Sequence, residues 1–150
     1  MKINIRKIVV LPLLLVTLIA CGQKQNSAKK EQNLDLNKSI MQSETILKPV
    51  KTLIEAMQAE NADLIKAQFS QLATQAYGAE GKMKTPEETR KWIQSDILDR
   101  NGKVANPEYT IISEKEVVVK GQYSSEGYTN KANFLFTVEN GLITSWRMRY

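Results

Sequence analysis

The 150-residue chain has no histidine and a single cysteine, and each scarcity excludes a class of chemistry. Without histidine there is no imidazole general base, no imidazole metal ligand and no serine–histidine or cysteine–histidine nucleophile pair. One cysteine cannot form an intramolecular disulfide or a multi-cysteine zinc or iron–sulfur site. The seven glycines are scattered, so the chain has no glycine-rich phosphate-binding loop. We therefore expect no metal and no other cofactor.

The positive charge is concentrated at the start of the chain. The whole sequence carries 21 Lys and Arg side chains against 16 Asp and Glu, a net charge of +5. Lys2, Arg6 and Lys7 form a basic segment, and residues 8–19 follow without a charge. A basic segment before a short apolar one is typical of a secretory signal peptide, whereas a membrane-spanning helix needs about 20 apolar residues.

The only cysteine lies directly after this apolar segment, in the sequence Leu18-Ile19-Ala20-Cys21. The segment resembles the lipobox of bacterial lipoproteins, with Ala20 before the cleavage site and Cys21 as the lipidated residue. The resemblance implies removal of residues 1–20 as a signal peptide, a diacylglyceryl group on the Cys21 sulfur and acylation of the new amino group by a fatty acid such as palmitate. Two or more acyl chains give a stable membrane anchor. The alternatives are a secreted protein without an anchor and an N-terminal anchor helix with a buried cysteine.

The same resemblance implies a location in the cell envelope. Gly22, rather than an aspartate, follows Cys21. In a cell with two membranes the lipoprotein pattern then implies sorting to the outer membrane. In a cell with one membrane the protein would stand on the outer face of that membrane.

A polar segment separates Cys21 from the rest of the chain. Residues 22–43 contain few apolar side chains and no aromatic one, a composition that buries too little surface to fold. We expect the lipidated cysteine and a flexible tether over residues 21–44 and one folded domain over residues 45–150. Without the leader the chain keeps 18 basic and 16 acidic side chains, and the domain alone carries a net charge of +1. This balance gives no support for a nucleic-acid partner.

Helical patterns occupy the first half of the domain. Apolar side chains at helical spacing predict a helix over residues 45–59, with Pro49 in its first turn. A second helix is predicted to begin at a cap, Asn61 or Asp63, and to end before Gly78. Its apolar stripe consists of Ile65, Phe69, Leu72 and Ala76.

The third helix has the clearest start signal. Thr85 is the predicted N-cap, Pro86 occupies the first helical position, and Glu88 completes a capping box. The helix is expected to carry Trp92 and to end at Asn101-Gly102, because glycine commonly follows the last helical residue.

After Pro107 the apolar pattern alternates with a period of two. Residues 109–112, 117–123, 132–138 and 142–148 are rich in β-branched and aromatic side chains and are predicted to be strands. Three helices followed by an antiparallel sheet give an α+β fold, with the helices covering the apolar face of the sheet.

The last two strands are joined through Glu139-Asn140-Gly141, a hairpin signal. A two-residue loop would pair Phe134 with Arg147, whereas a three-residue loop pairs Phe134 with Trp146 and Val138 with Leu142. Only the second register places all the large apolar side chains on one face. We therefore predict a three-residue loop with Gly141 in the left-handed conformation.

The order of these elements is similar to that of the NTF2-like superfamily, which is also called cystatin-like or SnoaL-like. The resemblance is carried by residues 50–57 with Asn61-Ala62-Asp63, by Trp92-Ile93, and by the closing segment from Phe134 to Trp146. It covers roughly residues 46–150 and implies N-terminal helices packed on a bent antiparallel sheet with a conical cavity between them. Enzymes, binding modules and assembly parts all use this fold, so the fold does not decide function.

Aromatic side chains are the candidates for lining such a cavity, although side chains of this kind also form ordinary cores. The candidates are Tyr77, Trp92, Tyr109, Tyr123, Phe134, Phe136 and Trp146.

Asp96 is the one acidic candidate for catalysis. Enzymes of the superfamily generally use an aspartate or a histidine inside the cavity, and this chain has no histidine. Asp96 follows Trp92 by four residues and so shares its helix face. The alternative is a solvated acid on an amphipathic helix, which is the usual place of aspartate.

Three functions follow from these features. The leading hypothesis is a non-catalytic, lipid-anchored domain of the cell envelope that binds a small apolar ligand or an envelope protein. The second is a small enzyme of the cyclase or isomerase type that uses Asp96. The third is an immunity or assembly partner in the envelope.

Overall fold

The computed structural model describes the backbone of residues 24–149 and the side chains of residues 37–149. The predicted signal peptide and the lipidation site at Cys21 lie outside the described residues. The chain divides into two compact units after Asp35, and the domain described below lies in the second unit, up to residue 149.

Helix α1 spans Lys24–Gln58 and begins earlier than the sequence pattern indicated. Residues 24–44, which we predicted as a coil, are helical because this polar segment is rich in Lys, Gln and Glu, which are good helix formers. Pro49 therefore lies inside the helix rather than in its first turn, where it removes one backbone hydrogen bond. The role of residues 21–44 as a tether stays a prediction.

The predicted second helix is wrong beyond its first turns. Helix α2 covers only Ala62–Ala67, with the Asn61 side chain accepting a hydrogen bond from the Leu64 N–H at 3.0 Å. Strand β1 then runs over Phe69–Tyr77, and Leu72, placed in the predicted apolar stripe, is 76% exposed. Parallel pairing with the last strand of the chain decides this conformation, and helix propensity is too weak to prevent it.

The start of helix α3 confirms the predicted capping box. The helix spans Pro86–Trp92. The Glu88 backbone N–H donates to the Thr85 hydroxyl at 3.3 Å, and the Thr85 backbone N–H donates to the Glu88 carboxylate at 2.7 Å. The helix continues as a π-helical segment, η1, over Ile93–Leu98. The chain leaves this segment through Asn101, at φ 51°, and Gly102, whose N–H donates to the Ile97 carbonyl at 2.8 Å.

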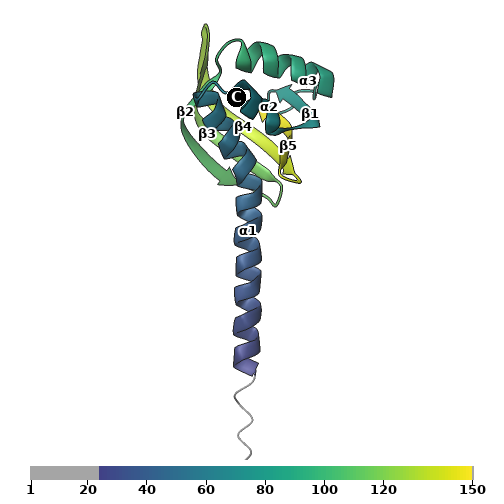
Figure 1. Ribbon diagram of the computed structural model, residues 1–150, viewed down its shortest axis with the longest axis vertical. Helices are drawn as coiled ribbons and strands as arrows, with labels where there is room; N and C mark the ends of the chain where they lie inside the picture. Colours follow the sequence, from purple (N-terminus) through teal and green to yellow (C-terminus); the bar gives the residue numbers. More distant parts are fainter. Residues whose placement is uncertain (1–23, 150) are drawn as a thin grey trace, which may run out of the picture. The chain divides into compact units, whose positions relative to one another are not determined.

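Five strands form one sheet in the order β1-β5-β4-β3-β2 (Figure 1). The strands after β1 are β2 (Lys103–Ile111), β3 (Glu116–Ser125), β4 (Tyr128–Glu139) and β5 (Leu142–Met148). β1 pairs with β5 in parallel, and the other pairs are antiparallel. β2 begins before the predicted residue 109 and contains Pro107 at an irregularity, which an edge strand tolerates.

The predicted register of the last hairpin is wrong, and a bulge explains why. The loop has two residues, Asn140 and Gly141, both at positive φ, and Val138 faces Ile143 rather than Leu142. Thr144 is then passed over in the pairing, so that Phe136, rather than Phe134, faces Trp146. The bulge turns the large apolar side chains of β5 inward without a three-residue loop.

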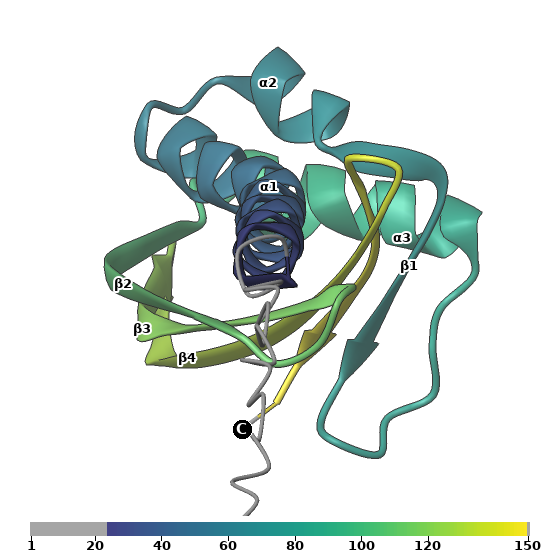
Figure 2. The same ribbon diagram turned by 90° about the horizontal axis from the view of Figure 1, so that it is seen from below.

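Helices α1 and α3 cover the same face of the curved sheet, as Figure 2 shows, and one core joins them to it. Val50, Leu53 and Ile54 of α1 pack with the inward side chains of the strands, among them Phe136 and Trp146. This arrangement confirms the predicted α+β class. Among the described residues no helix is long and apolar enough to cross a membrane.

Candidate functional site

A cavity of about 200 Å³ opens between the α3–η1 segment and the strands of the sheet. Its apolar wall is made by Tyr77, Trp92, Tyr123, Tyr128, Phe134 and Met148. Its polar side chains are Asp96, Arg100, Ser125, Asn130 and Lys131. A hollow lined by aromatic rings with a few polar groups is the usual form of a small-molecule site.

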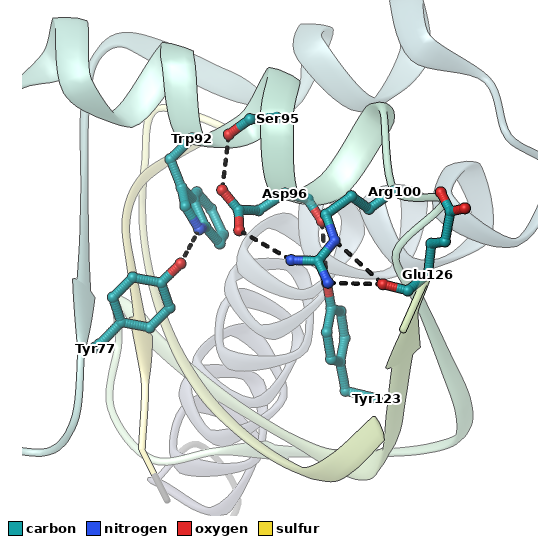
Figure 3. Close-up of polar contacts among 7 residues, drawn as sticks. All are labelled: Tyr77, Trp92, Ser95, Asp96, Arg100, Tyr123 and Glu126. Atoms are coloured by element: carbon teal, nitrogen blue, oxygen red, sulfur yellow. Dashed lines mark hydrogen bonds and ion pairs between the residues drawn. The ribbon is translucent and has the colours of Figure 1, made fainter. Parts of the chain in front are cut away.

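Tyr77 and Trp92 form one side of the cavity. Trp92 projects from the end of α3 and donates its indole N–H to the Tyr77 hydroxyl at the end of β1 (Figure 3). The two rings meet edge to face with centroids 6.2 Å apart, and the Lys84 ammonium lies 4.5 Å from the centre of the Tyr77 ring. The pair joins the helix to the edge of the sheet.

Tyr123 lies on the opposite side, on β3. Its ring contacts the rings of Tyr128 and Phe134, and its hydroxyl donates to the Asp96 backbone carbonyl at 3.3 Å. Burial raises the pKa of Tyr123 above its usual value, because a buried phenolate loses its hydration. The phenol therefore stays neutral and acts as a hydrogen-bond donor at the cavity wall.

Asp96 and Arg100 are polar members of the wall on the helix side. The Ser95 hydroxyl donates to one carboxylate oxygen of Asp96 at 2.7 Å, and an Arg100 nitrogen lies 3.9 Å from the other oxygen. The Arg100 guanidinium also donates to the Glu126 backbone carbonyl at 2.6 and 3.2 Å (Figure 3). The aspartate charge is therefore balanced by a cation that is itself fixed to the β3–β4 turn.

The structure brings together four of the seven predicted aromatic residues, and Asp96 joins them. The four that line the cavity are Tyr77, Trp92, Tyr123 and Phe134.

The other three aromatic residues lie elsewhere. Phe136 and Trp146 are buried in the core, with exposures of 0% and 1%, and do not line the cavity. Tyr109 lies in a separate groove between α1 and β2, where the Lys51 ammonium is 5.6 Å from its ring centre. Partial burial also raises the pKa of Tyr109.

Sequence reasoning missed five wall residues, which are Arg100, Ser125, Asn130, Lys131 and Met148. Arg100 had a usable signal, because it follows Asp96 by four residues and Trp92 by eight on one helical stretch. Asn130 and Met148 had none, since only the strand pairing brings them to the cavity. Among the side chains that the structure describes, no three acids or cysteines are grouped to hold a metal ion.

No family model matches the sequence, and no curated protein matches it. Solved structures do match. An NTF2-like protein of unknown function from Cytophaga hutchinsonii is 20% identical with a TM-score of 0.54, over 66% of this chain and 83% of that chain. The RV0760c protein of Mycobacterium tuberculosis in complex with estradiol-17beta-hemisuccinate is 19% identical with a TM-score of 0.60, over 71% and 93%.

An enzyme has a similar structure. The Delta 5-3-ketosteroid isomerase from Mycobacterium sp. is 12% identical with a TM-score of 0.58, over 71% of this chain and 92% of that chain. At such identities a structural likeness establishes the arrangement of helices and strands, and function must be argued from the site. The chain has the NTF2-like fold.

Proposed function

We propose that this chain is a lipid-anchored protein of the cell envelope whose NTF2-like domain binds a small, largely apolar ligand without transforming it. The observation that carries the ligand-binding part is the cavity beside Trp92, with aromatic walls and a few polar groups. The anchoring part rests on the lipobox-like segment that ends at Cys21.

The size of the cavity limits the ligand. A dry cavity of about 150 Å³ accepts benzene, and this cavity measures about 200 Å³. The ligand that fits this cavity is therefore a molecule of one or two fused rings. The RV0760c protein is in complex with a steroid conjugate, and another structural neighbour is a ketosteroid isomerase. Both support an apolar ring compound as the ligand here, although the cavity of this chain fits a smaller one.

The surroundings of Asp96 favour binding over catalysis. A general base must reach the substrate proton with a carboxylate that is available to accept it. Here the Ser95 hydroxyl and the Arg100 guanidinium face the two Asp96 oxygens. Asp96 therefore acts as part of the wall in this proposal, and turnover of a bound ligand would favour the enzymatic alternative.

Coumarin, a neutral two-ring molecule, is a suitable probe of the cavity. The chain has two tryptophans, and one of them, Trp92, lines the wall. We expect coumarin to quench the tryptophan emission of the full chain, held in phospholipid nanodiscs, along a saturable binding curve. Ser125 lines the cavity, so Ser125→Phe should fill part of it and abolish the saturable quenching.

Ser113→Phe is the matched control, because Ser113 is exposed and does not line the cavity. It should bind coumarin as the native chain does. The proposal fails if coumarin gives no saturable quenching, or if Ser125→Phe and Ser113→Phe bind it equally.

A further inference from the structure

The core contains three polar side chains whose hydrogen-bonding atoms have no partner among the described residues. Gln75 is completely buried and Thr89 is 1% exposed. Both amide atoms of Gln75, the Thr89 hydroxyl and the Trp146 indole N–H are unpaired. Buried polar groups in folded proteins are nearly all hydrogen-bonded, and an unpaired one destabilises the fold. Several of them in one core require an explanation.

These three residues lie in the same layer of the molecule. Gln75 on β1 is the register partner of Trp146 on β5. Gln75 also shares its strand face with Tyr77, two residues further on, which contacts Trp92 of α3. Thr89 is the other buried residue of α3 beside Trp92. The unpaired groups therefore lie between α3 and the β1–β5 pair.

This layer adjoins the ligand cavity. Tyr77 and Met148 are register partners that line the cavity, and Gln75 and Trp146 form the neighbouring pair on the same face. The Trp92 ring lies edge-on against Trp146, with centroids 5.0 Å apart. The hydrogen-bonded Tyr77–Trp92 pair, drawn in Figure 3, therefore lines the cavity at the end next to Gln75.

We propose that the cavity has a deeper polar end, formed by Gln75, Thr89 and the Trp146 N–H, which a ligand reaches when the Tyr77–Trp92 contact opens. The ligand of this end is a flat, neutral ring compound that carries adjacent N–H and C=O groups, such as a lactam. This inference rests on the proposed ligand-binding function and specifies the chemistry of its ligand.

The chemistry of the three side chains selects this ligand class. A glutamine amide offers a donor and an acceptor side by side, which match the C=O and N–H of a lactam. The Trp146 N–H is a further donor, and the Thr89 hydroxyl can donate or accept. None of the three groups carries a charge, and a charged ligand would be desolvated there without a counter-ion.

Tyr77 is the residue that moves when the Tyr77–Trp92 contact opens. Its side chain is at the edge of the sheet and 41% exposed, so solvent lies beside the ring. Turning the ring outward breaks its contacts with Trp92 and Lys84. Gly78 follows at φ 76°, where the backbone leaves the strand. Trp92, by contrast, is only 4% exposed and packs on Trp146, so it stays in place.

Two probes of the same shape test the proposal. 2-Quinolone carries an N–H beside its carbonyl, and coumarin has a ring oxygen at that position. For the full chain in phospholipid nanodiscs, we expect tryptophan quenching to give an affinity for 2-quinolone about tenfold higher than for coumarin, because coumarin leaves buried polar groups unpaired. Gln75→Leu should remove this preference while coumarin still binds.

Gln71→Leu is the matched control, because Gln71 is an exposed glutamine of the same strand. It should keep the preference for 2-quinolone. Thr89→Val, a nearly isosteric change, should weaken the preference and serves as the second variant if Gln75→Leu does not fold. The melting temperature of unliganded Gln75→Leu should rise by a few degrees, because an unpaired buried amide is removed.

The outcomes separate this inference from the proposed function. If neither probe binds the native chain, the ligand-binding function itself is wrong. If both bind equally well, the cavity binds ligands but the polar end is not used, and the inference alone is overturned. A fall in the melting temperature of Gln75→Leu would also overturn it, because the amide would then already have a partner in the fold.

Discussion

At the scale of single residues, Tyr123 shows how one side chain serves both the core and the cavity. Its ring is 7% exposed and contacts Phe134, while its hydroxyl reaches the Asp96 backbone carbonyl in η1. The hydrogen bond joins β3 to the π-helical segment that carries Asp96 and Arg100. Tyr123 therefore fixes the distance between the two sides of the cavity.

Tyr123→Phe should reduce stability at neutral pH and change the response to alkali. Loss of one hydrogen bond from a buried hydroxyl costs about 1 kcal/mol. Burial raises the pKa of Tyr123, so its contribution is fully present below the unfolded tyrosine pKa of about 10 and is lost as the pH rises through the folded value. The native chain should therefore lose more stability than Tyr123→Phe above about pH 10.

Urea unfolding at neutral pH and in alkali measures this difference. Tyr109, whose pKa is also raised by burial, is present in both proteins, so the comparison isolates Tyr123. Equal losses of unfolding free energy in alkali for the two proteins would contradict the assignment of the raised pKa to Tyr123.

Residue types alone did not separate wall residues from core residues. Phe134 lines the cavity, while Phe136, two residues further on the same strand face, is completely buried in the core. Both fit the alternating pattern equally well, because alternation defines only a face of a strand. Which of the two phenylalanines borders the cavity depends on where α3 and η1 end above the sheet. The spacing of Phe134 and Phe136 in the sequence carries no information about that position.

At the scale of secondary-structure elements, the β4–β5 hairpin combines a tight turn with a bulge. Asn140 and Gly141 have positive φ angles of 52° and 75°, the requirement of a two-residue type I′ turn. The bulge at Thr144 then aligns Phe136 with Trp146. The turn fixes which residues pair next to it. The bulge shifts the pairing by one residue, and so changes the β4 partner of every β5 residue beyond it.

Gly141 and Gly121 both have positive φ, 75° and 157°, and of the two only Gly121 is also crowded by its neighbours. At Gly141 an added Cβ meets nothing within 4 Å, so Gly141→Ala costs only the positive φ, about 1 kcal/mol. At Gly121, on β3, the added Cβ would lie 2.7 Å from the Ala105 carbonyl oxygen of β2. Because that neighbour is backbone, Gly121→Ala should lower the unfolding free energy more than Gly141→Ala, as measured in urea. Equal losses would contradict the steric argument.

Elements with local signals were predicted, and elements that depend on distant pairing were not. The capping box at Thr85 and the strands β3, β4 and β5 follow from residues close together in the sequence. β1 does not, because its segment Phe69–Tyr77 contains Leu, Ala and Gln, and its partner β5 begins only at Leu142. The cavity was incompletely predicted for the same reason, since Tyr77 and Met148 meet only through that parallel pairing.

At the scale of the whole molecule, membrane attachment would depend on lipid rather than on charge. Most of the excess positive charge lies in Lys2, Arg6 and Lys7, which leave with the proposed leader. The remaining chain has 18 basic and 16 acidic side chains. Since each basic residue near an anionic surface contributes only about 1 kcal/mol, a surplus this small holds a protein weakly.

Cys21→Ala should therefore release the protein from the membrane or leave it unprocessed. Two buried acyl chains contribute about 0.8 kcal/mol per methylene, far more than the residual charge supplies. In cells fed labelled palmitate, we expect label on the native chain and none on Cys21→Ala. Ser27→Ala, six residues beyond the cysteine, is the control and should be labelled and sedimented with membranes as the native chain is. A Cys21→Ala chain that is cleaved after Ala20 and still sediments with membranes would show that something other than the acyl groups holds the domain at the envelope.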